Sequence, residues 1–381
     1  MIQKKIQNGA GLAIVYYHIA LLIALPFYFY FDPPSQGMVI TTIVLYFLTG
    51  ISITAGYHRY YSHKTYKMSR IPEFFILYLA TMAAQGSVLR WAFEHRLHHA
   101  YVDTDNDPYS VKKGFWYAHV LWLMEKPRPI DPKFVKDLLK NKWIVFQDKY
   151  YITLLLLTNV PVFLLAGWFF NDFTGAFLLA IWTRVLALHH STWFINSLAH
   201  TWGAQTFSKE HSAVDNFLIS FLTFGEGYHS YHHTFAMDYR NGIHWYHFDP
   251  TKWLIWGLSK CKLAWDLRKL DTYSIRKRLV MEDKNLLLEQ IKHLIYVRKE
   301  LLEQKILEMS DKIAQQISEF QQLIREYKTQ KHLTAAEDLK ILKLQIKSMK
   351  KTIHREWKNW ITLSEQIMHL KPLALSSESA H

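Results

Sequence analysis

Residues 11–31, GLAIVYYHIALLIALPFYFYF, carry no charged side chain and are long enough to cross a bilayer. Lipid offers no partner for backbone N–H and C=O groups, so a spanning segment of this kind must be helical. Three more apolar runs follow, at residues 38–57, 151–170 and 173–196. The four runs predict an all-α integral membrane protein, a four-helix transmembrane bundle beneath a helical cap.

The turns inside the two predicted hairpins are free of Lys and Arg. They read DPPSQG at residues 32–37 and Asn171-Asp172. Lys4 and Lys5 precede the first run, and basic residues follow the second. Because positive charge stays on the cytoplasmic side, we expect the turns to face out and both termini and the cap to face the cytoplasm. A bacterial inner membrane and the endoplasmic reticulum both fit this multi-pass topology.

Composition narrows the class of partner. Half of the residues are hydrophobic and the formal net charge is +13. No nucleic-acid-binding module is recognisable, so we expect the basic excess to face anionic lipid or an anionic ligand and expect no nucleic acid. The single cysteine, Cys261, excludes an intramolecular disulfide. The first apolar run is too long for the core of a signal peptide, and no cleavable leader is expected.

Two polar features interrupt the apolar runs. Residues 71–89 contain Glu73, Gln85 and Ser87, so an interfacial helix and a further span both remain open. Arg184 lies within the last run, where contact with lipid would be costly, and we expect it to face the bundle or a cavity.

Histidines gather in clusters at the cytoplasmic ends of the predicted helices. Two clusters, at residues 95–99 and 229–233, place histidines at i, i+3 and i+4, which lie on one face of a helix. His58 and His63 are five apart, so we expect them to approach a site from a helix end and the loop after it. His200 ends the last run. Neutral imidazole binds iron, zinc and copper.

Nine histidines are too many for one metal ion and suit two: His58, His63, His95, His98, His99, His200, His229, His232 and His233. Structural zinc usually takes four ligands, often cysteine, and haem takes only one or two axial histidines. The set therefore favours a pair of irons with positions open to dioxygen. His189 and His190 are further candidates, either as ligands or as structural and substrate-lining residues.

The composition changes at about residue 279. Ile306, Ile313, Phe320 and Tyr327 recur every seven residues, a spacing typical of a coiled coil. Thr334 to Glu337 matches a capping box and predicts a second helix that ends near residue 370.

These patterns predict a membrane domain at residues 1–260, a linker at 261–278, a coiled-coil-like helical hairpin tail at 279–371 and a disordered end at 372–381. The tail fits either the docking of a partner or homo-oligomer formation.

Four motifs carry a resemblance to a known family. They are HRxxxH at residues 58–63, HRLHH at 95–99, NSLAH at 196–200 and GEGYHSYHH at 225–233. With the run DTDNDPY at 103–109, they resemble the membrane fatty acyl desaturases of the stearoyl-CoA (delta-9) type, over roughly residues 10–260.

The resemblance implies that the nine histidines hold two iron ions, Fe2+ or Fe3+, with O2 as co-substrate. It implies that Asn196 contacts the centre through water and that Lys112 and Lys113 meet the phosphates of coenzyme A. A solvated surface pair is the alternative for the two lysines. The implied substrate is a long-chain acyl-CoA or another acyl thioester. No cytochrome b5 domain is recognisable, so we expect a separate electron donor, a cytochrome b5 or ferredoxin with its reductase.

Choosing one methylene pair in a uniform chain requires a bent apolar tunnel. Thr192 and Trp193, one to two turns before His200, are candidates for its wall, with ordinary helix packing as the alternative. Ser230 stands where the family usually has Asn, and Leu121 stands where a Gly is common. Neither is a candidate ligand.

Two other functions are compatible with the sequence. A related di-iron membrane hydroxylase would also use histidine clusters, but the NSxAH and GEGxH elements favour desaturation. A membrane scaffold that acts through its tail would not need all nine histidines.

Overall fold

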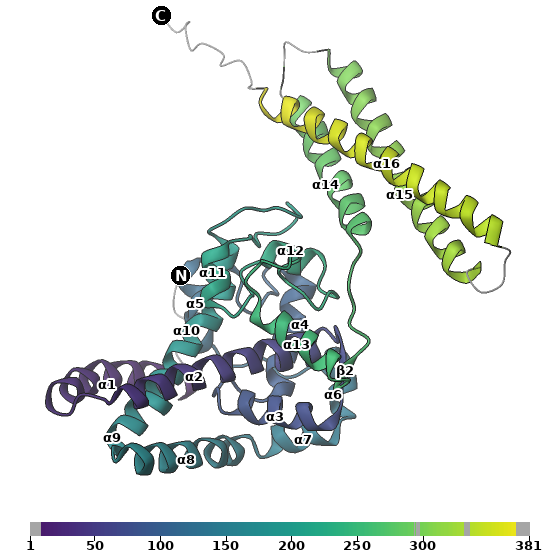
Figure 1. The fold of residues 1–381 in the computed structure, drawn as a ribbon. Helices are drawn as coiled ribbons and strands as arrows, with labels where there is room; N and C mark the ends of the chain where they lie inside the picture. Colours follow the sequence, from purple (N-terminus) through teal and green to yellow (C-terminus); the bar gives the residue numbers. More distant parts are fainter. Residues whose placement is uncertain (1–8, 293, 295–297, 331–335, 371–381) are drawn as a thin grey trace, which may run out of the picture. The chain divides into compact units, whose positions relative to one another are not determined.

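The computed structural model describes residues 9–292, 294, 298–330 and 336–370. The predicted disordered end lies outside these residues. The chain divides into two compact units, Met1–Lys269 and Leu270–His381, which are treated separately below. Both are built from helices, as predicted, and the described residues contain only two short strands (Figure 1).

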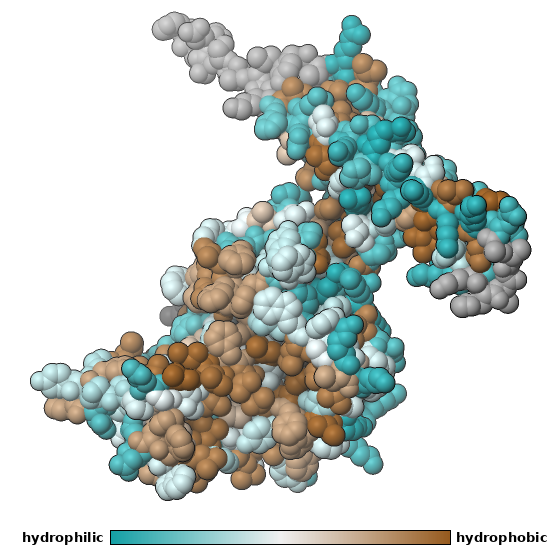
Figure 2. Space-filling view, viewed as in Figure 1, coloured by the Kyte–Doolittle hydropathy of each residue, from teal (hydrophilic) through white to brown (hydrophobic). Residues whose placement is uncertain are grey.

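Three helical stretches of unit 1 are long and apolar enough to cross a membrane. They are Gly11–Phe31, Gln36–Ser62 and Tyr151–Phe170, within α1 (Gly9–Phe31), α2 (Gln36–Ser52) with its continuation, and α8 (Tyr151–Phe170). Their surfaces are widely exposed, with Leu22 72% and Trp168 76% accessible. Figure 2 shows the corresponding brown surface over the lower part of unit 1, where α2, α3 and α8 lie. Such a surface suits contact with lipid.

Local chemistry sets the turns between these helices. The Ser35 hydroxyl accepts a hydrogen bond from the Met38 N–H and caps α2. Asn171 ends α8 with φ 50, in the left-handed region that Asn tolerates better than most residues. Asp172 then accepts from the Gly175 N–H and starts α9 (Phe173–Gly175). These are the two turns that the sequence predicted.

The second span continues past α2 into the π-helix η1 (Ile53–Ser62). The predicted span at 38–57 is therefore longer, because no turn interrupts the helix before His63. π-helical turns are rare and occur mostly at functional sites. Here the turn carries His58 and Arg59.

The predicted fourth span, residues 173–196, is divided between α-helix and π-helix, and a 3-10 turn follows it. α9 leads to the π-helix η4 (Ala176–Thr183), then to α10 (Arg184–Ser197) and to the 3-10 turn η5 (Leu198–His200). It is not among the three candidate spans, so a four-helix transmembrane bundle stays a prediction. Arg184 is buried, and its Nη2 donates to Asn159 Oδ1 at 2.5 Å and to the Met82 carbonyl at 3.2 Å.

The apolar stretch at 71–89 forms no single helix. α3 (Arg70–Thr81) covers its first part, turns follow, and α4 (Val88–Tyr101) starts where the Ser87 hydroxyl accepts from the Arg90 N–H. The stretch therefore contains one shorter helix in its first part, and it is not among the three candidate spans.

Short helices and turns complete unit 1. They are η2 (Val111–Lys113), α5 (Phe115–His119), η3 (Leu121–Met124), α6 (Pro132–Leu139), α7 (Lys142–Lys149), α11 (Phe217–Leu222), α12 (His229–Thr234) and α13 (Pro250–Lys260). β1 (Lys67–Met68) pairs antiparallel with β2 (Ala264–Trp265). A buried cluster joins η1, α3 and α4, with Tyr57 and Ala92 fully inaccessible.

Unit 2 consists of α14 (Thr272–Lys292), α15 (Lys299–Gln330) and α16 (Ala336–Met368). The sequence predicted two helices here, whereas the structure has three: α14 begins inside the expected linker and ends before the heptad stripe, and α15 and α16 pack against each other as a pair. That stripe is buried at Ile306, Ile313 and Phe320. The third helix is needed because α14 covers this core with residues such as Leu287. Thr334, the predicted cap of the last helix, lies outside the described residues.

Candidate metal centre

Helix α4 presents His95, His98 and His99 from its last two turns. His95 and His99 are one turn apart, and their ring centroids lie 4.7 Å from each other. His98 projects from a neighbouring position and faces a different set of histidines. The three histidines of HRLHH thus lie on one helix, as their spacing predicted. They do not all contact the same set of neighbouring histidines.

His58 and His63 come together through the π-helical turn. The His63 N–H donates to the His58 carbonyl at 3.1 Å, an i to i+5 hydrogen bond. Five residues fill slightly more than one turn of such a helix, so the two rings approach, with centroids 4.9 Å apart. The sequence predicted His58 at a helix end and His63 in the loop after it. That expectation was incomplete, because it assumed the rotation per residue of an α-helix.

His229, His232 and His233 lie on the short helix α12. The turn before it requires glycine, because Gly225 has φ +102 and a Cβ there would lie 2.6 Å from Asp249 Oδ1. His200 ends η5 and is buried.

Together these elements place the nine histidines in two groups. In each group one ligand atom per residue lies within 4.8 Å of all the others. The five-histidine group contains His58, His63, His95, His99 and His232, and the four-histidine group contains His98, His200, His229 and His233.

The distances between ring nitrogens suit shared metal ions. His63 Nε2 lies 2.7 Å from His95 Nε2, and His232 Nε2 lies 3.0 Å from His99 Nε2. A metal–imidazole bond of about 2.1 Å places neighbouring ligand atoms about 3 Å apart. In the four-histidine group, His200 Nε2 is buried and has no partner among the described residues. A buried polar atom of this kind indicates an ion or water, so the residues present fit metal binding.

Burial also keeps the rings in the form that binds metal. It lowers the pKa of His95, His99, His232 and His233 well below the usual value, and the neighbouring imidazoles lower it further. Neutral imidazole has a lone pair for a metal, whereas the protonated ring has none.

Carboxylates and a hydroxyl hold the opposite nitrogens of three of the nine rings. His98 Nδ1 lies 2.9 Å from Asp107 Oδ1. His200 Nδ1 lies 2.8 Å from Ser212 Oγ, which donates to Asp103 Oδ1 at 2.6 Å. Partners of this kind fix the tautomer and orientation of ligating histidines.

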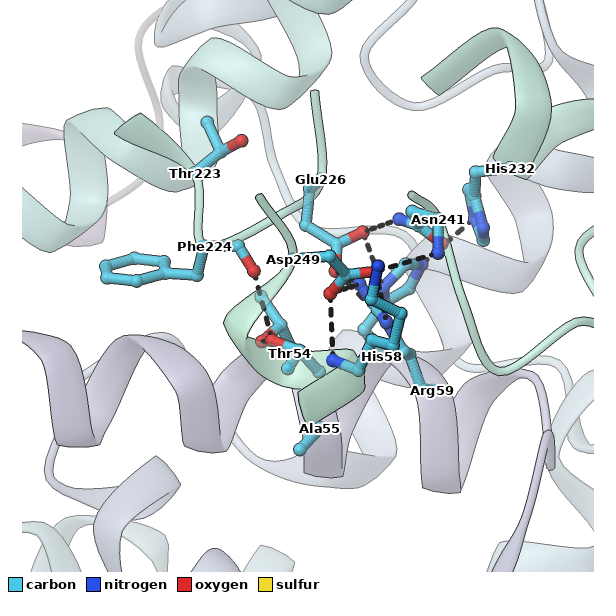
Figure 3. A network of polar contacts seen from close by, with 12 residues as sticks. Thr54, Ala55, His58, Arg59, Thr223, Phe224, Glu226, His232, Asn241 and Asp249 are labelled. Atoms are coloured by element: carbon cyan, nitrogen blue, oxygen red, sulfur yellow. Dashed lines mark hydrogen bonds and ion pairs between the residues drawn. The ribbon is translucent and has the colours of Figure 1, made fainter. Parts of the chain in front are cut away.

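Glu226 holds the third ring and the surrounding loops. His58 Nδ1 lies 3.0 Å from Glu226 Oε2, and Arg59 Nη2 donates to Glu226 Oε1 at 2.9 Å. Asn241 Nδ2 donates to the same carboxylate at 2.5 Å, and Asp249 pairs with Arg59 at 3.0 Å (Figure 3). Burial alone would raise the pKa of Glu226, but the charges of His58 and Arg59 lower it to about 2.

Sequence reasoning did not assign roles to Glu226, Asp107, Asp103 or Ser212. Glu226 lies inside the GEGYHSYHH motif, and both aspartates lie in the DTDNDPY run that follows HRLHH. Their position within or beside the histidine motifs was the available signal. Ser212 lay in no noted motif. His211 was also missed: it is buried, its ring centroid lies 5.1 Å from that of His233, and its ring nitrogens have no partner among the described residues.

A cavity of about 750 Å³ reaches the histidines. His58, His95, His98 and His229 form part of its wall, while the remainder includes apolar residues of α8, η4 and α10. Those apolar residues include Leu155, Leu156, Phe177, Ile181, Trp182 and Trp193. Ligand sites commonly combine such an apolar lining with a few polar groups.

Residues 33–263 match the family described as fatty acid desaturase, which is more than half of the chain. The chain belongs to the fatty acid desaturase family.

Relatives within this family have related names. The chain is 39% identical over 277 residues to a probable acyl-CoA desaturase of Schizosaccharomyces pombe, covering 71% of this chain and 58% of that protein. It is 39% identical over 258 residues to acyl-CoA desaturase 1 of Saccharomyces cerevisiae, covering 66% of this chain and 50% of that protein. It is 34% identical over 245 residues to human stearoyl-CoA desaturase, covering 62% of this chain and 67% of that protein. The chain thus spans only about half to three fifths of the two fungal desaturases.

Three other residues that the sequence singled out line the cavity: Asn196 of the NSLAH motif, and Thr192 and Trp193, the candidates for the tunnel wall. The Thr192 hydroxyl accepts from Gln85 Nε2 at 2.8 Å, which joins α10 to the turn before α4 across the cavity wall.

Lys112 and Lys113 are exposed and are not part of the cavity lining. Arg90, Lys126 and Arg128 line it instead. Sequence reasoning missed these three because they are scattered along the chain.

His189 and His190 belong to neither histidine group. His189 lines the cavity, with Nδ1 2.8 Å from the Tyr17 hydroxyl. His190 lies 3.0 Å from both His18 and His119. In this member of the desaturase family, a structural or substrate-lining role for the two residues stays a prediction, and their positions outside both histidine groups are compatible with it.

Proposed function

We propose that this protein catalyses the O2-dependent desaturation of a long-chain fatty acyl thioester, an acyl-CoA, and forms a cis double bond at the delta-9 position. The observation that carries the proposal is the apolar cavity whose wall contains histidines of both groups. Membership of the desaturase family and the names of the relatives support it.

Iron fits the donor set of this proposal better than zinc or haem, for the reasons of ligand number and type given above. Two irons held by the five- and four-histidine groups would supply the activated oxygen that an unactivated C–H bond requires. Overall, two adjacent methylenes, one O2, two electrons and two protons give one double bond and two waters. A separate donor supplies the electrons.

The residues of the chain bind and orient the substrate. Leu155, Phe177 and Ile181 form an apolar lining that favours an acyl chain and excludes water. The hydrogen bond between Gln85 and Thr192 fixes the wall beside Trp193, and fixed positioning is what selects one methylene pair.

The charged part of the lining suits the carrier. Arg90, Lys126 and Arg128 bring positive charge to the same cavity, and guanidinium and ammonium groups bind phosphates well. We therefore assign the phosphates of coenzyme A to these residues in preference to Lys112 and Lys113.

The test is the fatty-acid profile of a host that lacks its own desaturase and contains a competent electron-donor chain. The intact protein should produce monounsaturated acids, and His232→Ala should abolish them because His232 belongs to the five-histidine group. His369→Ala, at an exposed position directly after α16, serves as the matched control and should leave the products unchanged.

Mass spectrometry then locates the double bond and tests the delta-9 assignment. Hydroxylated acyl chains in place of unsaturated ones would refute desaturation and support the related hydroxylase. An unchanged profile from folded, iron-loaded protein would refute both.

A further inference from the structure

Helix α16 carries a dense run of positive charge on its exposed side. Between Leu339 and Lys358 the sequence contains seven basic residues and one acidic residue. The basic residues are all exposed: Lys340, Lys343, Lys347, Lys350, Lys351, Arg355 and Lys358. We call these seven residues the basic stripe.

The stripe lies on one face of the helix. Successive members are three or four residues apart, except Lys350 and Lys351, which are adjacent, and these spacings keep all seven on the same side of the α-helix. The 18 steps from Lys340 to Lys358 correspond to a length of about 27 Å. Ile353 and Trp360, on the opposite face, are fully inaccessible and belong to the core of unit 2. The orientation of α16 within unit 2 therefore holds the stripe outward.

Neighbouring acidic groups do not neutralise the stripe. Within the part of the chain that the structure describes, none of its six lysines forms an ion pair. The one acidic residue of the segment, Glu356, is buried and pairs with Lys312 at 3.2 Å and with Arg355 at 3.6 Å. On α15, Glu319 and Glu326 accept hydrogen bonds from glutamines of their own helix.

Two exposed apolar side chains accompany the charges. Leu344, four residues after Lys340, is 60% accessible, and Ile341 beside it is 51% accessible. A helix that presents Lys and Arg together with exposed aliphatic side chains is typical of binding at the interface of an anionic membrane.

We propose that the basic stripe of α16 binds the anionic lipid headgroups of the membrane that unit 1 spans. Unit 2 is part of the same chain, and only residues 266–271 lie between β2 and α14. Such a short connection keeps the stripe at a high effective concentration near the bilayer, so each contact with a headgroup needs little affinity of its own. Clusters of four to eight Lys or Arg residues on an amphipathic helix are typical of binding to phosphatidylserine and phosphoinositides.

A bilayer fits the stripe better than an acidic protein does. The charges are spread in a line over five turns, whereas a protein partner would require a compact apolar centre with a polar rim. The inference does not depend on the proposed enzymatic reaction, since it uses only the tail and the membrane location.

The experiment uses the full chain, one copy per nanodisc, with a fluorescent label that reports its surroundings. Cys261→Ser removes the native thiol, and Leu344→Cys places the label within the stripe without changing its charge. The discs contain either phosphatidylcholine alone or an equal mixture of phosphatidylcholine and phosphatidylserine. The readouts are the emission maximum and quenching by acrylamide, which is uncharged.

The mixed discs should shift the emission to the blue and protect the label, and high salt should reverse both effects because it screens the charges. Adding Lys347→Glu and Lys350→Glu should remove the protection. The charge-matched pair Lys305→Glu and Lys328→Glu, on exposed positions of α15, should retain it. Circular dichroism checks that all variants remain helical.

Three results would overturn the proposal. The first is equal quenching of the label in both kinds of disc, and the second is equal protection in both. The third is a loss of protection with the α15 substitutions as complete as with the α16 substitutions. Protection that arises in neutral discs only when an acidic protein is added would assign the stripe to a protein partner instead.

Discussion

Each histidine group depends on side chains that are not ligands. Glu226 illustrates this at the scale of the residue, because one carboxylate holds His58, Arg59 and Asn241 at once. Breaking a buried ion pair by removing one charge leaves the other charge without compensation, which is strongly destabilising. The ring of His58 then also loses the partner that fixes its tautomer.

Glu226→Gln should therefore weaken metal binding by the five-histidine group 10- to 100-fold, the range typical of such partners. The measurement is iron bound per chain, by elemental analysis against free iron concentration. Glu300→Gln, at an exposed position of α15, is the control for loss of a carboxylate. Equal iron binding by both variants would contradict the role given to Glu226.

Asp215 offers a pH-dependent test away from the ligands themselves. Burial raises its pKa to about 6, although hydrogen bonds, including one from the Tyr231 N–H at 3.2 Å, oppose the shift. The unfolded carboxyl has a pKa of about 3.9. The folded state therefore holds its proton more tightly, so the stability contribution is full below pH 3.9 and is lost as the pH rises through 6, by about 3 kcal/mol in total.

Asp215→Asn should flatten this part of the stability curve. In thermal unfolding between pH 4 and pH 6.5, the difference in unfolding temperature between variant and native protein should grow in favour of the variant as the pH rises. Asp105→Asn, at an exposed position, should track the native protein. A difference that does not vary with pH would rule out the raised pKa.

At the scale of the element, the turn before α12 decides whether its histidines reach the site. Gly225 combines a positive φ with a close approach to Asp249, whereas Gly114 has φ +111 and open space around it. The two glycines separate backbone strain from steric contact.

Gly114→Ala should cost about 1–3 kcal/mol through strain alone. Gly225→Ala should cost more, because its Cβ displaces Asp249, and it should also reduce iron binding by moving α12. Thermal unfolding and iron content measure the two effects. Equal losses of stability with normal iron content in both variants would show that the contact with Asp249 is unimportant.

The elements also explain which features the sequence could predict. The i, i+3, i+4 spacing identified His95, His98 and His99 correctly as a cluster on one helix, because α-helical geometry is local. It did not reveal the π-helical turn at His58, whose i, i+5 spacing looks like a broken helix when α geometry is assumed. Nor did it reveal the pairing of Ser212 with Asp103, which depends on contact between residues 109 apart.

At the scale of the molecule, unit 1 combines two histidine groups and a wide exposed apolar surface, and one cavity reaches the histidines. The sequence predicted apolar helices and histidines on one side of the membrane, but the cavity arises only when α8, η4 and α10 pack together. The same reason explains why Arg90, Lys126 and Arg128 were missed: three separate positive charges carry no motif until the fold gathers them.

The shape of this cavity should limit the length of the acyl chain. Ile181→Trp adds bulk to its apolar wall and should shift the products toward shorter chains without abolishing desaturation. Leu157→Trp, at a position that is 61% accessible and outside the cavity lining, is the matched control. Chain lengths in the fatty-acid profile measure the effect, and an identical shift in both variants would contradict it.

The histidine groups also have a consequence for the connectivity of the chain. His99 and His232 are 133 residues apart in sequence, and His98 and His233 are 135 apart, yet each pair shares a group. A metal ion bound to either group would close a loop of this length, as a disulfide does, and a cross-link over roughly 100 residues is worth about 4–5 kcal/mol in chain entropy. The chain has one cysteine and so forms no internal disulfide, and bound metal ions would take the place of such cross-links. The metal centre would then stabilise the folded chain in addition to its part in the reaction.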